Sequence, residues 1–288
     1  MKFFIPVFTL LVLLGCSSTP RRPAENLSQR NIAYSQLNMA NQAANQGRYD
    51  DAFIFLSEAR RIALSTDDPV LRLETSMTRA NILFSMGNAE DAFREWAAAS
   101  AEGITSGQNE LAALARVFSI RASLTLLGNN DTINSNMVQD YRAALEREIP
   151  SFGRNSHSLA QLNLTIGLAE KLLGNWTEAE NAVRRGLTIL ERGNFLEDTA
   201  YAWFLIGSIR SQAGNYESAL EALDRSIGFD RRAENSFGLA SSWQAVGDVQ
   251  SRAGRPAESR AAWYRAAEIF RAIGLDHRAE ILEVRINE

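Results

Sequence analysis

The chain has 288 residues, of which 45% are hydrophobic and 22% are charged, and its formal net charge is -4 at pH 7. This balance is typical of a folded globular protein and excludes a chain that is disordered or membrane-embedded throughout. The lack of a basic excess also argues against a nucleic acid partner, because phosphate backbones are bound by clustered positive charge.

Arginine supplies nearly all of the positive charge. Of the 30 basic residues, only Lys2 and Lys171 are lysines. Arginine forms planar, bidentate contacts with carboxylates and stacks on aromatic rings, so this bias favours a surface rich in ion pairs. A genome that prefers arginine codons is an equally good explanation.

Residues 1–15 have the composition of an export signal. The twelve-residue apolar stretch Phe3–Leu14 is too short to cross a bilayer of about 30 Å as a helix. It ends in Leu13-Leu14-Gly15-Cys16, which resembles the lipobox of bacterial lipoprotein signal peptides, although Leu14 stands where Ala, Ser, Thr or Val is more common. The resemblance implies cleavage after Gly15 and lipidation of Cys16. The alternatives are an uncleaved anchor and an ordinary signal with an accidental cysteine.

The segment 16–30 is polar and contains prolines, and we expect it to form a lipidated tether. Cys16 is the only cysteine of the chain, so its lipidation leaves no thiol and no disulfide. Two or three acyl chains make a durable anchor, whereas one binds only marginally. Ser17 differs from the aspartate that retains many lipoproteins in the inner membrane. By this resemblance we expect the outer membrane, with the protein facing the periplasm.

Five short stretches share one pattern and reveal internal repeats. They read GRYDDAF, GNAEDAF, GNWTEAE, GNYESAL and GRPAESR, and they begin at Gly47, Gly87, Gly174, Gly214 and Gly254. Neighbouring glycines are 40 residues apart, except for one gap of 87 residues that leaves room for a sixth, degenerate unit around residue 128. This period predicts about six units over residues 31–273.

Each unit has an amphipathic stretch before its glycine and another after it. Apolar residues recur at i, i+3 and i+4 in both stretches, which predicts two helices joined by a tight turn. Glycine suits this turn because it adopts the left-handed conformation without strain. Acidic residues open the second helix, where they complement its dipole. A small residue five positions after the glycine, such as Ala219 or Ser259, lets the two helices approach closely.

This pattern resembles the tetratricopeptide repeat. The residues that carry the resemblance best are Trp203-Phe204-Leu205-Ile206-Gly207 with Gly214, Ala219 and Leu223, followed by Trp243, Gly247, Gly254 and Trp263. The resemblance implies an all-α, right-handed α-solenoid over residues 31–273, whose first helices line a concave groove.

The period of about 40 residues departs from the 34 of that family, and we expect the extra residues to lengthen helices or inter-repeat loops. An irregular loop is expected at residues 129–136 and a C-terminal capping helix at 274–288.

The sequence offers no constellation typical of catalysis. We expect His157 in an inter-repeat loop and His277 in the cap, far from each other, whereas zinc sites need clustered ligands. Paired carboxylates recur at helix starts, where capping explains them better than acid/base chemistry. The tryptophans are expected between helices rather than in a ligand cage. We therefore expect no enzyme, no metal site and no cofactor.

The groove is the remaining candidate for function. Counting from the repeat glycines, the predicted groove residues are Tyr34, Asn41, Asn45, Met77, Asn81, Phe84, Phe118, Lys171, Tyr201, Phe204, Gln244, Asp248 and Arg252, together with Gln161 and Ser208. Amide and aromatic side chains suit an extended peptide or a partner helix. A clamp for a terminal carboxylate of the chaperone-binding kind is not expected, because Leu37 and Met77 replace its lysine. The alternative is a solvated groove and a binding surface on the convex face.

These observations predict a lipid-anchored scaffold or adaptor that mediates protein-protein interactions at the periplasmic face of the cell envelope, in an assembly or biogenesis complex. The expected partners are an envelope protein or peptide and, through the lipid, the membrane. The alternative is a ligand- or peptide-binding receptor lipoprotein that works with a transporter. The fold does not choose between pathways, because repeat folds serve many functions.

Overall fold

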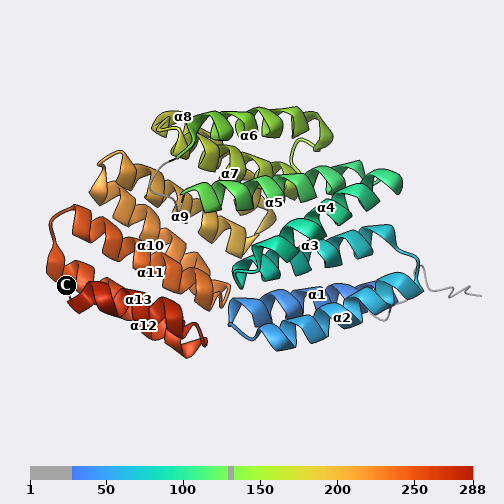
Figure 1. Ribbon diagram of the computed structural model, residues 1–288, viewed down its shortest axis with the longest axis horizontal. Coiled ribbons are helices and arrows are strands. Elements are labelled where there is room, and N and C mark those ends of the chain that lie inside the picture. The colour runs from blue at the N-terminus through green and yellow to red at the C-terminus, as the bar shows by residue number, and fades with distance from the viewer. Residues whose placement is uncertain (1–27, 129–132, 288) are drawn as a thin grey trace, which may run out of the picture.

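Residues 28–128 and 133–287 are described by a computed structural model, and they contain thirteen α-helices, one short 3₁₀ helix and no strand (Figure 1). The predicted signal segment, Cys16 and the tether up to residue 27 lie outside the described residues. The helices are α1 (Gln29–Asn45), α2 (Tyr49–Ser65), α3 (Pro69–Ser85), α4 (Ala89–Thr105), α5 (Asn109–Gly128), α6 (Ser135–Glu148), η2 (Ile149–Ser151), α7 (His157–Leu172), α8 (Trp176–Gly193), α9 (Leu196–Gln212), α10 (Tyr216–Arg232), α11 (Ser236–Arg252), α12 (Pro256–Ala272) and α13 (Asp276–Asn287).

The helices form antiparallel pairs, from α1/α2 to α11/α12, and α13 follows the last pair (Figure 1). Both helices of a typical pair, such as α9 and α10, have 17 residues, and short turns separate them. The 40-residue period therefore arises from long helices rather than from long inter-repeat loops. The predicted all-α fold of helix-turn-helix repeats is confirmed.

Left-handed residues end the helices at regular intervals. Gly174 and Gly214 adopt φ values of 79° and 84° at turns within pairs, as the sequence predicts. The turns between pairs use the same geometry, with Asn194 at φ 56° and Glu234 at φ 54°. In the turn after α9, the Asn215 backbone N–H donates to the Arg210 carbonyl at 2.9 Å, which satisfies an otherwise free carbonyl at the helix end.

Small residues set the distance between the two helices of a pair. A Cβ atom on Gly207 would lie 2.7 Å from Cγ of Leu223, so the glycine is required by close packing. Ala219 is fully buried at the same interface. Ser259, which replaces this alanine in the last pair, is 1% exposed, and its hydroxyl donates to the Gly247 carbonyl at 2.9 Å. The polar replacement is thus tolerated because its hydrogen bond is satisfied.

Arginines and tryptophans contribute to the same interfaces. The guanidinium carbon of Arg225 lies 4.5 Å from the ring centroid of Trp203, and the equivalent distance from Arg265 to Trp243 is 4.7 Å. Such cation-π contacts stabilise a helix pair modestly. The arginine bias of the sequence therefore has a structural use in stacking as well as in ion pairs.

The third pair is the irregular one. Helix α5 has 20 residues and α6 only 14, and η2 follows α6 before α7 begins. Of the loop predicted at 129–136, residues 129–132 lie outside the described part, and Ser135 and Asn136 already belong to α6. His157 is the first residue of α7 and not a loop residue, so that prediction was wrong.

By length and composition, α5 is the single described helix that could cross a membrane. In the structure it packs against α3, α4, α6 and α7, and this packing accounts for its apolar composition.

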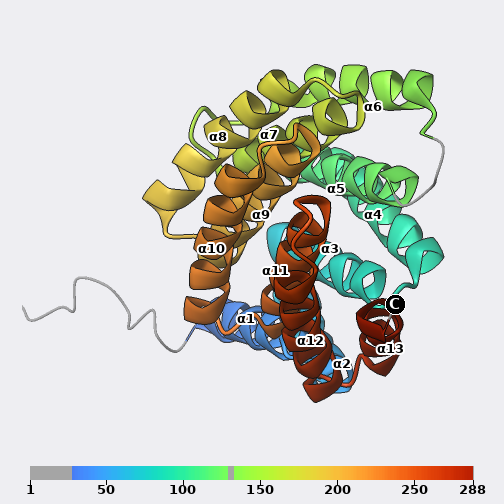
Figure 2. The ribbon, with the colours of Figure 1, turned by 90° about the vertical axis from the view of Figure 1, so that its left-hand side faces the viewer.

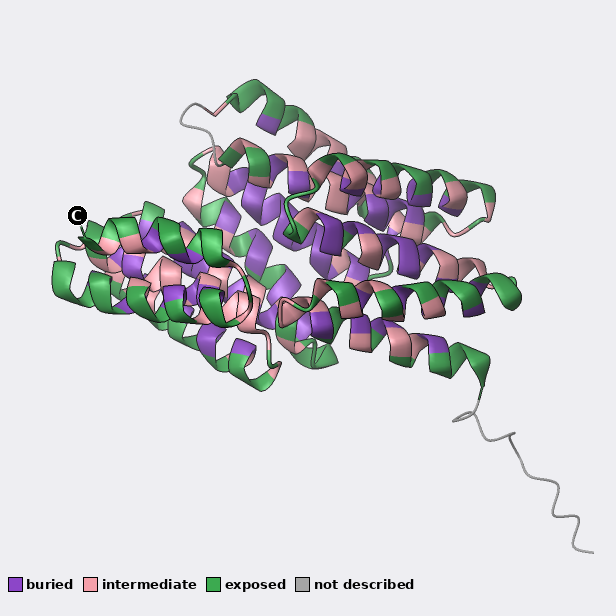
Figure 3. Cartoon of the chain, turned by 60° about the horizontal axis from the view of Figure 1, so that its bottom comes forward, coloured by how far each residue is buried: buried purple, intermediate pink, exposed green. Residues whose placement is uncertain are grey.

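The solenoid curves until its ends meet. Figure 2 shows α1 beside α11, and the two helices are in contact. Gln42 Nε2 donates to Glu234 Oε2 at 3.3 Å, and the turn at Gly47 lies against the Ile273 carbonyl. Buried residues lie where helices face one another, and exposed residues lie on the outer faces (Figure 3). We call the contact between α1 and the C-terminal repeats the closure seam.

Candidate binding surface

Helix α9 is buried on most of its circumference. Its incompletely buried residues include Tyr201, Phe204 and Ser208, which share one face because they follow one another at intervals of three and four residues. The other faces pack against α7, α8, α10 and α11. This stripe is the surface of α9 that neighbouring helices leave partly open.

Aromatic rings and one arginine meet at the N-terminal half of the stripe. The rings of Tyr201 and Phe204 stack with centroids 6.3 Å apart. The guanidinium carbon of Arg121, from α5, lies 5.6 Å from the Tyr201 ring and 5.4 Å from the Phe118 ring. Cations favour the electron-rich faces of aromatic rings, so the arginine helps to hold the three rings together.

Arg121 is positioned by helix α7. Its Nε donates to Thr165 Oγ1 at 3.0 Å, and its Nη2 donates to the Gln161 carbonyl at 2.7 Å. Burial lowers the pKa of Arg121, partly offset by the negative charge of Asp198. Within the described residues, Arg121 forms no ion pair at salt-bridge distance.

A histidine and a carboxylate lie beside this cluster. His157 Nε2 is 2.6 Å from Asp198 Oδ2 and 3.0 Å from Gln161 Nε2, and its ring contacts the Phe195 ring at 4.5 Å between centroids. Burial alone would raise the pKa of Asp198, but the His157 hydrogen bond and the Arg121 charge lower it overall. Asp198 is therefore a charged group whose hydrogen-bond partner, His157, belongs to the same chain.

The other end of the stripe is positively charged. Arg252 Nη1, from α11, donates to Ser211 Oγ of α9 at 3.0 Å. Lys171 lies near Arg252 at the end of α7, and burial, together with the charge of Arg252, lowers its pKa to about 8. In the described part of the chain, neither cation has a carboxylate at ion-pair distance.

The structure brings six predicted groove residues to this region: Phe118, Lys171, Tyr201, Phe204, Ser208 and Arg252. We call these residues, together with Arg121 and Ser211, the inner-face site. Sequence reasoning missed Arg121 and Ser211. The repeat period could have found them, because Arg121 and Ser211 contact residues 40 and 41 positions further along the chain.

Other predicted groove residues have structural roles. Met77 is only 4% exposed and belongs to the hydrophobic core, so its assignment to the groove was wrong. Asn81 Oδ1 accepts from Trp96 Nε1 at 3.2 Å, and Asp248 Oδ1 accepts from Trp263 Nε1 at 3.0 Å. These two polar groups face the second helices of their own pairs.

The remaining predicted residues lie apart from the inner-face site or on its margin. Phe84 packs on Trp96, Tyr34 contacts Glu74, Asn41 is exposed and Gln244 is half-buried on α11. Gln161 is 2% exposed beneath Arg121. Asn45 lies at the closure seam, where its side chain interacts with Glu197.

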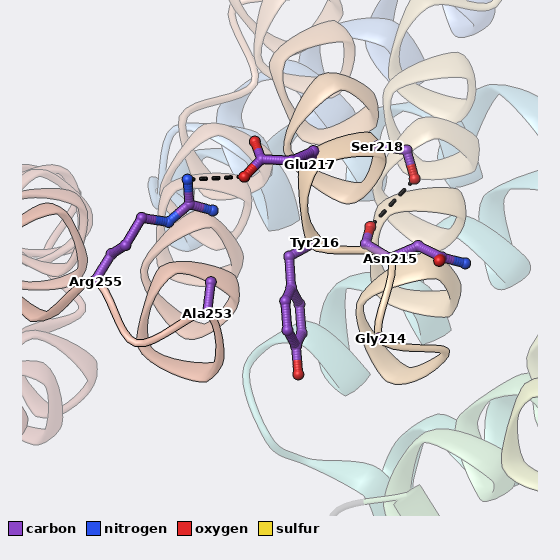
Figure 4. Close-up of a pocket in the computed structure, with 7 residues that line it drawn as sticks. All are labelled: Gly214, Asn215, Tyr216, Glu217, Ser218, Ala253 and Arg255. Carbon is purple, nitrogen blue, oxygen red and sulfur yellow. Dashed lines mark hydrogen bonds and ion pairs between the residues drawn. The ribbon is translucent and has the colours of Figure 1, made fainter.

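A cavity of about 600 Å³ opens between the turns at Gly214 and Gly254 (Figure 4). Arg255 Nη1 and Glu217 Oε1 form an ion pair across it at 3.0 Å (Figure 4). None of the predicted groove residues lines this cavity. Across residues 28–128 and 133–287, no three His, Cys, Asp or Glu side chains are grouped as a metal site would require.

Comparison with known proteins identifies the type of helical repeat. The sequence model of the tetratricopeptide repeat matches residues 200–232, which cover most of the α9/α10 pair. The fold is a helical-repeat solenoid of the tetratricopeptide type. No curated protein matches the chain by sequence.

Two solved structures have the same overall solenoid. One is a Rap protein complexed with competence and sporulation factor, with a TM-score of 0.56 and 16% identity over 91% of this chain and 75% of that one. The other is the signal transduction ATPase with numerous domains of Pyrococcus horikoshii, which has a tetratricopeptide repeat sensor; its TM-score is 0.59 with 14% identity over 88% of this chain and 37% of that one. At these identities the likeness concerns the fold of the tetratricopeptide solenoid.

Proposed function

We propose that this protein is a non-catalytic scaffold that holds a peptide segment of a partner protein on its inner-face site. The observation that carries the proposal is the partly open stripe of Tyr201, Phe204 and Ser208 on an otherwise buried helix. Aromatic rings provide contact area at low cost in conformational entropy, and hydroxyl groups beside them satisfy peptide backbone groups. The Rap protein that shares the fold is itself seen in a complex with a second molecule.

We also propose that the scaffold is a lipoprotein of the cell envelope, anchored through Cys16 and facing the periplasm from the outer membrane. The support is the sequence Leu13-Leu14-Gly15-Cys16 after an apolar segment, followed by Ser17. In this arrangement the tether separates the solenoid from the membrane, so that the inner-face site meets periplasmic proteins. An assembly or biogenesis complex of the envelope is the proposed setting.

A pull-down from solubilised membranes tests the binding function. Phe204→Ala removes an aromatic ring from the inner-face site, whereas Tyr264→Ala removes a ring that is 56% exposed on α12. We expect Phe204→Ala to lose the partner that wild type and Tyr264→Ala both retain, with all three proteins equally helical by circular dichroism. Retention of the same partner by Phe204→Ala would remove the inner-face site from consideration.

Labelling with palmitate tests the anchor. The wild-type chain is expected to incorporate the label and to sediment with membranes, and Cys16→Ala is expected to do neither. The reason is that both proposed acylation sites, the thiol and the amino group that cleavage exposes, belong to Cys16. Equal labelling of both proteins would contradict the assignment of Cys16.

A further inference from the structure

We propose that the inner-face site recognises an acidic peptide segment, in which two carboxylates flank apolar residues. This inference rests on the proposed function and specifies the chemistry of the segment. It is carried by three cations, Arg121, Lys171 and Arg252, that lie around the α9 stripe with no carboxylate at ion-pair distance in the described residues. Asp198, whose charge acts on Arg121, is itself hydrogen-bonded to His157.

The lack of partners is unusual for the inner helices of this protein. Other arginines of the first helices pair with carboxylates, as Arg116 does with Glu148 at 2.6 Å and Arg210 with Glu180 at 2.8 Å. A partly buried cation is costly unless an anion compensates it. Lys171 is desolvated and repelled by the charge of Arg252, which is exposed, so a carboxylate bound between the two cations would offset both costs at Lys171.

The cations lie at opposite ends of the stripe. Arg121 is at Tyr201, and Arg252 is at Ser211, with Lys171 near Arg252. These two positions of α9 are ten residues apart, which corresponds to about 15 Å at 1.5 Å per residue. An extended chain covers about 3.3–3.6 Å per residue, so the two ends are matched by carboxylates roughly four to five residues apart.

The residues between the ends favour a peptide over a small anion. Phe204, whose ring stacks on that of the end residue Tyr201, presents an aromatic surface to a bound segment, and Ser208 offers a hydroxyl group to its backbone. A small anion would reach one end of the stripe only and would leave the aromatic rings unused. An apolar segment with an acidic residue at each end uses all of these groups.

Fluorescence polarisation with synthetic peptides provides the test on the full chain in detergent. The probes are fluorescein-labelled peptides with two glutamates separated by one to six apolar residues, each matched by a peptide with two glutamines. We expect the glutamate peptides to bind more tightly, with an optimum at three to four intervening residues. We also expect this preference to weaken with added salt, since Arg252 is exposed to solvent.

Substitutions on the protein locate the effect. Lys171→Gln and Arg252→Gln are each expected to weaken binding of the best glutamate peptide roughly three- to tenfold and to leave the glutamine peptide unchanged. Arg260→Gln is the control, because Arg260 is an exposed arginine of α12 outside the site. Arg121 is left intact in this series because its hydrogen bonds join α5 to α7.

The outcomes separate this inference from the proposed function. If glutamate and glutamine peptides bind equally well, and Phe204→Ala abolishes the binding of both, the acidic preference is overturned and the binding site is supported. Displacement of the peptide by inorganic phosphate at equal concentration would assign the cations to a small anion and would also overturn it. A partner that crosslinks at Phe204 through a segment without acidic residues would do the same, and the scaffold function would stand.

Discussion

Gly207 and Gly228 are both helical glycines of the fifth pair, yet their surroundings differ completely. A Cβ atom on Gly207 would meet Leu223 at 2.7 Å and the Ala219 carbonyl at 3.2 Å, whereas a Cβ atom on Gly228 would meet nothing within 4 Å. Leu223 is fully buried and has little room to move. Packing therefore requires glycine at one position and leaves the other free.

Alanine substitutions separate these two cases. We expect Gly207→Ala to lower the free energy of unfolding by about 1–3 kcal/mol, because overpacking displaces neighbouring side chains. Gly228→Ala should raise it by up to about 1 kcal/mol, since alanine is the better helix former. Urea denaturation followed by circular dichroism measures both. A gain in stability for Gly207→Ala would contradict the packing described for this pair.

Asp230 links stability to pH. It is 2% exposed, and its carboxylate accepts hydrogen bonds from Asn235 Nδ2 at 2.8 Å and from the Ser242 hydroxyl at 3.2 Å. Burial, helped by the negative charge of Glu197, raises the pKa of Asp230 to about 7 despite these hydrogen bonds. The folded chain thus keeps a proton at pH values where the unfolded chain has lost it.

The resulting contribution to stability is complete below the unfolded pKa, near 3.9, and is lost as the pH rises through about 7. We expect the free energy of unfolding to fall between about pH 4 and pH 7, by on the order of 2–4 kcal/mol from this residue. Asp230→Asn removes the titrating group and should flatten the profile, as measured by urea denaturation across that range. An unchanged slope in the variant would show that other groups cause the pH dependence.

At the scale of elements, turn conformation matters as much as packing. Gly214 has φ 84°, and a Cβ atom there would again meet nothing within 4 Å. Only the backbone conformation distinguishes it from Gly228. The two positions therefore form a matched pair for the cost of a left-handed turn.

Gly214→Ala is expected to lower the free energy of unfolding by about 1–2 kcal/mol, because a Cβ atom is disfavoured in the left-handed region. Gly228→Ala is the control with equal space and helical geometry. Thermal unfolding of the two variants side by side checks the difference. Similar melting temperatures would mean that the turn is not held in this conformation.

The sequence predicted these elements well because their signals are local. Apolar spacing and the glycine at each turn predicted most helix pairs, and alanine or glycine at set places predicted close packing. The turns at Asn194 and Glu234 were missed because non-glycine residues adopt the left-handed conformation there. The site was predicted in part, since Tyr201 and Phe204 follow from repeat positions.

Contacts between successive helix pairs were not predicted, although the repeat period indicates which residues can form them. His157 and Asp198 are 41 residues apart and therefore occupy nearly equivalent places on successive inner helices. Polar residues separated by one period were candidates for such contacts. The roles of Met77 and Asn81 could not be foreseen in this way, because burial depends on how far each helix is rotated toward its neighbour.

At the scale of the whole molecule, curvature brings α1 to α11 and forms the closure seam. Curvature accumulates from a small rotation at each interface between pairs, so short-range patterns do not predict it. The seam contains few strong interactions. Gln42 and Glu234 form one exposed hydrogen bond of 3.3 Å, and the Asn45 side chain interacts with Glu197. Such contacts contribute little net free energy.

Gly47 tests whether the seam closes the solenoid in solution. A Cβ atom on Gly47 would lie 2.1 Å from the Ile273 carbonyl, whereas a Cβ atom on Gly87 would meet nothing within 4 Å, and both glycines have left-handed φ values. We expect Gly47→Val to increase the radius of gyration in small-angle X-ray scattering, and Gly87→Val to leave it unchanged. Equal radii for both variants would mean that the ends of the solenoid are already apart.

Site-specific photocrosslinking tests the central claim, binding on the inner face of the solenoid, most directly. A photoreactive phenylalanine analogue is placed at Phe204 in the inner-face site or at Tyr264 on α12, and the crosslinked partner segment is mapped by mass spectrometry. We predict a crosslink from position 204 to a segment that carries acidic residues around apolar ones, and none from position 264. Crosslinks from position 264 alone would contradict the claim and would place binding on the outer surface.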